Sequence, residues 1–99
     1  MMKNEREIKM LVRLEKYTTE YMSLEREKEI YYTKNVRNIS RTVIVTLYLK
    51  QCYIDTLIKQ ICTLVARLDR NGIDYDNEVA THVYNEYGSL IKRGLFELL

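Results

Sequence analysis

The chain contains no proline and only three glycines, all in its last third, at positions 72, 88 and 94. Proline and glycine are the residues that most strongly disfavour the interior of a helix. The first 71 residues therefore hold no strong helix breaker, and long helices are the simplest structure open to them. We expect a mainly helical protein.

The segment between Ser40 and Asp69 shows the clearest helical periodicity. Lys50 and Gln51 interrupt its apolar stripe, so the segment is either one rod or two helices bent near Gln51. The stripe comprises Val43, Leu47, Ile54, Leu57, Ile61, Leu64 and Leu68, and Ile44, Ile58 and Val65 widen it.

Asn71-Gly72 can adopt left-handed backbone angles and is expected to end this helix. Either Asp74 or Asp76 would then cap a last helix over residues 77–97. That helix should pack antiparallel on residues 54–69, so residues 53–99 are predicted to form a helical hairpin for oligomerisation or partner binding.

Residues 8–15, I-K-M-L-V-R-L-E, admit two structures. With a period of two, Ile8, Met10, Val12 and Leu14 share one face, which predicts a short strand followed by a helix that Thr18 or Thr19 would cap. With heptad spacing, one helix would run over residues 4–35. Its stripe would contain Met10, Leu14, Tyr17, Tyr21, Leu24 and Tyr31, interrupted by Lys28.

Composition limits the function classes. With 99 residues, of which 46% are hydrophobic and 30% charged, the chain is expected to fold as one small unit that gains from association. We therefore predict a homodimer or higher oligomer.

No apolar run has the length of a membrane span, and the start does not resemble a signal peptide, so we expect a cytoplasmic protein without a membrane partner.

The residues needed for catalysis or metal binding are scarce. Cys52 and Cys62 lie about 15 Å apart along one predicted helix, too far to form a disulfide with each other. His82 is the single histidine, and the acidic residues near Asp74 lack the spacing of a calcium loop. We predict no enzyme activity, no cofactor and no metal.

The charge pattern singles out the region around the start of the helix at Ser40. From Ile30 to Ile54 the chain has no Asp or Glu, although it holds 14 acidic residues in total. A helix N-terminus beside guanidinium groups can bind phosphate. The predicted phosphate contacts are Arg37, Ser40, Arg41 and Thr42.

If residues 8–15 form a strand, the chain begins with a strand, a helix, a polar turn and a capped helix. This order, together with N-I-S-R at residues 38–41, resembles the ribbon-helix-helix DNA-binding family. The resemblance covers residues 8–50 and implies a dimer whose paired strands enter the major groove of double-stranded DNA. It assigns the base contacts to Lys9, Leu11 and Arg13, and residues 1–52 would be the DNA-binding segment.

The remaining half resembles the helical hairpin of MobC-like plasmid mobilisation proteins, in the run L-I-K-Q-I-C-T-L-V-A-R-L-D-R-N-G (Leu57 to Gly72). This resemblance implies an accessory DNA-binding protein of a plasmid relaxosome, with a relaxase as a further partner. The family's N-x-N-Q run is absent, and only Gln60 corresponds to it.

The alternative is an all-α helical bundle in which residues 4–34 form one helix that packs on the hairpin. Such a protein would be a protein–protein interaction module, for example a viral or phage binder or an assembly subunit, without DNA binding. A salt-dependent DNA-binding measurement distinguishes the two functions.

Overall fold

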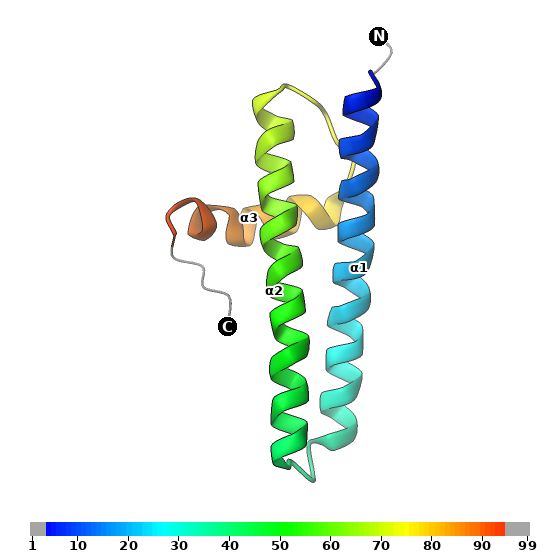
Figure 1. The fold of residues 1–99 in the computed structure, drawn as a ribbon, viewed down its shortest axis with the longest axis vertical. Coiled ribbons are helices and arrows are strands. Elements are labelled where there is room, and N and C mark those ends of the chain that lie inside the picture. The colour runs from blue at the N-terminus through cyan, green and yellow to red at the C-terminus, as the bar shows by residue number, and fades with distance from the viewer. Residues whose placement is uncertain (1–3, 95–99) are drawn as a thin grey trace.

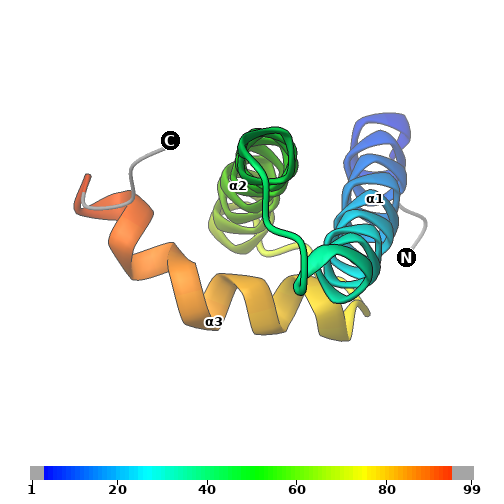
Figure 2. The same ribbon diagram turned by 90° about the horizontal axis from the view of Figure 1, so that it is seen from below.

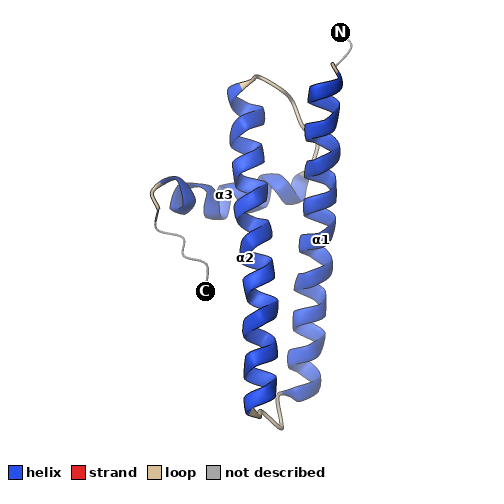
Figure 3. Cartoon of the chain, in the orientation of Figure 1, coloured by secondary structure: helices blue, strands red, loops and turns tan. Residues whose placement is uncertain are grey.

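The computed structural model describes residues 4–94, which form three helices and no strand (Figures 1 and 3). These are α1 (Glu5–Asn35), α2 (Arg41–Arg70) and α3 (Glu78–Lys92). Helices α1 and α2 form a long antiparallel hairpin, and α3 lies across one face of it (Figures 1 and 2). The alternative all-α architecture is therefore the one observed.

The predicted strand is wrong, because residues 8–15 lie inside α1. Met10, Leu14 and Thr18, each four positions apart, are the buried residues of this helix, so the helical period determines the structure of the segment. Asn4 caps the helix by accepting a hydrogen bond from the Glu7 N–H at 2.8 Å. Because the segment that should form the ribbon is helical, the predicted ribbon-helix-helix fold is wrong.

The segment from residue 40 to residue 70 is one helix rather than two. Its N-cap is Ser40, as predicted, and the Ser40 hydroxyl accepts a hydrogen bond from the Val43 N–H at 3.3 Å. Its end at Asn71-Gly72 also agrees with the prediction: Gly72 has a φ of 65°, and the Ile73 N–H donates to the Leu68 carbonyl at 2.9 Å. The boundary between the two predicted segments, at residues 52 and 53, falls inside α2.

Helix α3 differs from the prediction in its start and in its direction. Asn77, rather than Asp74 or Asp76, is the N-cap, and its side chain accepts a hydrogen bond from the Ala80 N–H at 3.0 Å. Instead of lying antiparallel on residues 54–69, α3 crosses the hairpin (Figure 1). The helix ends at Lys92, and residues 95–97 of the predicted helix lie outside the described residues.

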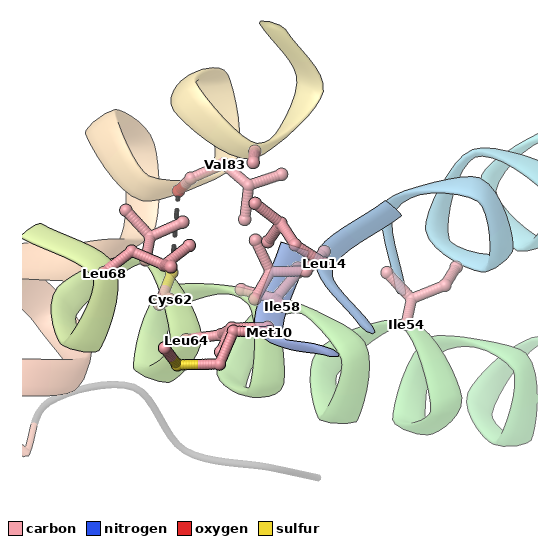
Figure 4. Close-up of a cluster of buried hydrophobic side chains, with 11 residues drawn as sticks. Met10, Leu14, Ile54, Ile58, Cys62, Leu64, Leu68 and Val83 are labelled. Carbon is pink, nitrogen blue, oxygen red and sulfur yellow. Dashed lines mark hydrogen bonds between the residues drawn. The ribbon is translucent and has the colours of Figure 1, made fainter. Parts of the chain in front are cut away.

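The apolar core lies where the three helices meet (Figure 4). Leu14 of α1, Ile58 and Leu68 of α2 and Val83 of α3 are almost completely buried there. The Cys62 thiol donates a hydrogen bond to the Val83 carbonyl at 3.8 Å, which links α2 to α3. Most buried positions of α2 lie beyond Ile54, in the half of the hairpin that α3 crosses.

A polar layer connects α1 and α2 in the other half. The Lys28 ammonium donates to the Gln51 amide oxygen at 2.6 Å, and the Gln51 amide nitrogen donates to the buried Asp55 carboxylate at 2.8 Å. Lys50 lies 3.9 Å from Glu27 and 5.6 Å from the centre of the Tyr31 ring. The two interruptions of the apolar stripes, at Lys28 and at Lys50-Gln51, therefore face each other across the hairpin.

Candidate functional site

The residues predicted to contact bases do not form a shared face. Lys9, Leu11 and Arg13 lie on α1, where alternate residues point in widely different directions. Lys9 lies 3.4 Å from Glu5, Leu11 is half-buried against the core, and Arg13 is exposed. The ribbon that would carry these three side chains into a DNA groove is absent.

The predicted phosphate contacts do lie together, at the turn between α1 and α2. Arg37, Ser40, Arg41 and Thr42 are all exposed there. From Arg13 to its end at Asn35, α1 continues for about 22 residues, a distance of roughly 33 Å. The base contacts and the phosphate contacts predicted from the sequence are therefore well separated along the hairpin.

A feature that the sequence did not reveal lies in the first half of α2. Ile44 was expected on the buried stripe, yet it is 57% exposed, and Leu49 and Tyr53 are 52% and 67% exposed. Together with their neighbours they form two adjacent rows of residues spaced four apart. We call this surface the α2 apolar face; it consists of Ile44, Val45, Tyr48, Leu49, Cys52 and Tyr53.

The α2 apolar face contains no charged side chain. Between Arg41 and Asp55 the single charged residue is Lys50, and its side chain is directed to Glu27 and Tyr31 of α1. The pKa of the Tyr48 hydroxyl is raised above its ordinary value, first by a hydrogen bond with Cys52 one turn away. The face is thus uncharged, rich in tyrosine and apolar, which is the composition of the core of a protein–protein interface.

One signal in the sequence could have located this surface. Residues 43–49, V-I-V-T-L-Y-L, are apolar around nearly the whole circumference of the helix. A helix of that kind has to be covered on more than one side. Val43 is buried, but the outward positions of this segment remain open within the described part of the chain.

The potential metal ligands among residues 4–94 do not gather into a metal site. His82 is exposed on α3 and lies 3.1 Å from Glu86 of the next turn. Within these residues no group of three His, Cys, Asp or Glu side chains is placed to hold a metal ion. None of the three helices has the length and apolar character needed to cross a membrane, as judged from the same residues.

Comparison with protein-family models, with curated proteins and with solved structures finds no match for this chain. The resemblance to mobilisation proteins therefore remains a hypothesis from sequence, and its ribbon-helix-helix component conflicts with the fold.

Proposed function

We propose that this protein is an all-helical protein–protein interaction module that associates with a second copy of itself through the α2 apolar face. The observation that carries the proposal is the uncharged, exposed apolar surface over residues 44–53.

The size of the face fits a dimer. A large side chain presents about 150–200 Å² when fully exposed, so five that are about half-exposed present about 400–500 Å² of apolar surface. This area is that of the largest apolar patch on a typical monomeric protein, about 300–600 Å², and such patches are often functional. Each partner of a stable complex buries about 800 Å², so this face would supply half or more of one side of the interface.

Charge and architecture favour a second copy as the occupant. Pairing two identical faces around a two-fold axis brings like charges together wherever the face is charged, and this face has none. In this half of the hairpin α1 and α2 are joined partly by the Lys28–Gln51–Asp55 layer instead of a thick core. Two such hairpins would complete each other as a four-helix bundle.

The test is a substitution at the centre of the face. Leu49→Asp buries a carboxylate in the proposed interface, so the variant should sediment as a monomer at concentrations where the wild type is a dimer. Ile8→Asp on α1 is the matched control, because Ile8 is 49% exposed, compared with 52% for Leu49, and lies near the other end of the hairpin. The proposal fails if the wild type is a monomer at micromolar to hundred-micromolar concentration, or if Leu49→Asp remains a dimer.

DNA binding is a second candidate, and the hairpin turn is the observation that favours it. Arg37 and Arg41 are exposed beside the N-terminus of α2, within the stretch that lacks acidic residues. If this turn contacts phosphates, Arg41→Ala should weaken binding to every duplex alike and reduce the salt slope by about one unit. Arg13→Ala, at the other end of the hairpin, should leave binding unchanged. Flat titrations of the wild type would eliminate this candidate.

A further inference from the structure

A basic groove lies between α1 and α2, beyond the α2 apolar face in the direction of the α2 C-terminus. Its volume is about 330 Å³, and its walls come from both helices of the hairpin. The apolar part is formed by Tyr17, which is half-buried, and Leu64, which is buried. Two threonines and a glutamine complete the wall on α2.

Three cations surround this apolar floor. Arg13 lies on the α1 wall, and Lys59 and Arg67 lie on the α2 wall. No carboxylate lines the groove. The ion pairs found within residues 4–94 involve Lys9, Lys50 and His82 and none of these three cations. The groove therefore presents positive charge on both sides of an apolar strip without an internal counterion.

We propose that this groove binds an acidic amphipathic helix of a partner protein. A groove between two antiparallel helices can accept a third helix, whose apolar side chains would pack on Tyr17 and Leu64. Lys59 and Arg67 are eight residues apart, which is about 12 Å or two turns along α2. Carboxylates two turns apart on one edge of the incoming helix would match them, and a carboxylate on the other edge would reach Arg13.

Other ligand classes fit the groove less well. Protein–DNA complexes of ordinary affinity neutralise about 6–10 phosphates, whereas this groove offers three cations around an apolar floor. A volume of 330 Å³ is near the lower limit for a pocket that encloses a small molecule, about 300 Å³. The groove is a different surface from the α2 apolar face, so this inference does not depend on self-association.

The probe for the test is a labelled synthetic helical peptide that carries leucines on one face and glutamates on both flanks of that face. A second peptide with every glutamate replaced by glutamine is its control. Fluorescence anisotropy with the full-length protein should show binding of the glutamate peptide that weakens as salt is added. The glutamine peptide should bind at least about ten-fold more weakly, which corresponds to the loss of about 1.4 kcal/mol.

Charge reversal then locates the binding site. Arg13→Glu and Lys59→Glu should each weaken binding of the glutamate peptide at least about ten-fold. Arg26→Glu is the matched control, since Arg26 is also an exposed arginine on α1 but does not line the groove, and it should bind like the wild type. Helix content measured by circular dichroism verifies that each variant folds.

Three results would overturn the inference. The first is equal binding of the glutamate and glutamine peptides, and the second is equal loss of binding in Arg13→Glu and Arg26→Glu. The third is the absence of any binding by the glutamate peptide at hundred-micromolar protein. Sedimentation of Arg13→Glu as the same oligomer as the wild type would show that the groove acts separately from the α2 apolar face.

Discussion

Tyr21 shows how burial of a single side chain makes stability depend on pH. Burial, and after it the charge of Glu25, raises the pKa of the Tyr21 hydroxyl from 10.0 to about 12. Below pH 10 the folded and unfolded states both keep the proton. Between pH 10 and 12 the unfolded state ionises first, so the free energy of unfolding decreases as the pH rises.

We therefore predict that Tyr21→Phe removes part of this pH dependence. Between pH 9 and pH 11 the wild type should lose up to about 1 kcal/mol more stability than the variant, measured by urea denaturation, because Tyr21 is only partly buried and solvent screens part of the effect. Tyr32→Phe is the matched control because Tyr32 is an exposed tyrosine on the same helix. If Tyr21→Phe and Tyr32→Phe lose stability equally, the ionisation of Tyr21 is not coupled to folding.

The two cysteines should differ sharply in reactivity. Burial raises the pKa of the Cys62 thiol to about 11, so at neutral pH almost no reactive thiolate is present at this buried position. Cys52 is partly exposed on α2. Alkylation of the native protein at pH 7.5 should modify Cys52 and leave Cys62 unmodified until urea unfolds the chain. Rapid modification of Cys62 in the native protein would contradict the core packing.

At the scale of elements, the link between α1 and α3 depends on a pair of side chains that no local pattern indicates. The Asn77 amide nitrogen donates a hydrogen bond to the Thr18 hydroxyl at 2.9 Å. Thr18 is 3% exposed, and its hydroxyl donates to the Leu14 carbonyl at 3.0 Å. The side chain of Asn77 thus caps α3 and fixes the start of α3 on α1 at the same time.

Asn77→Ala should accordingly destabilise the protein more than loss of an ordinary cap. Asn4→Ala is the matched control, since Asn4 caps α1 but is exposed and has the Glu7 N–H as its side-chain partner. We expect a loss of about 1 kcal/mol for Asn4→Ala and about 2–3 kcal/mol for Asn77→Ala, which also leaves the buried Thr18 without its donor. If thermal unfolding shows that Asn4→Ala and Asn77→Ala lose the same amount of stability, the Asn77–Thr18 hydrogen bond contributes nothing to the free energy of unfolding.

Local chemistry explains which elements could be predicted from the sequence. Ser40 and Asn71-Gly72 fix the two ends of α2 through their own side chain or backbone angles, so both ends were predicted correctly. Residues 8–15 fit a strand and a helix equally well over so short a range. The helix is favoured because it buries Met10, Leu14 and Thr18 against helices that are distant in the sequence. Local periodicity contains no information about such contacts.

The candidate surfaces were less predictable for the same reason. The direction of α3 depends on long-range contacts such as Asn77 with Thr18 and Cys62 with Val83. The α2 apolar face becomes visible once α1 and α3 are known to leave it open. The basic groove likewise requires Arg13 and Arg67, distant in sequence, to be placed on facing walls. Of the three groove cations, sequence reasoning singled out Arg13 alone, as a base contact, and it did not indicate that Lys59 and Arg67 would lie beside it.

At the scale of the whole molecule, the chain is an elongated body of 56 × 26 × 17 Å whose core is concentrated at one end of the hairpin. The α2 apolar face lies in the other half, and the acid-free turn lies at its tip. Such a division separates the surface that would pair two copies from the groove that would receive a further helix. Under both proposals, a dimer would present two basic grooves and would connect two identical acidic partners.

The most direct test of the central proposal measures whether a second copy covers the α2 apolar face in the wild type. The rate of Cys52 modification by a thiol reagent in fixed excess should fall several-fold as the protein concentration rises from micromolar to hundred-micromolar, because Cys52 lies within the face. In Leu49→Asp the rate should stay constant over the same range. A wild-type rate that does not change with concentration would show that the face remains open, and would contradict the proposed dimer.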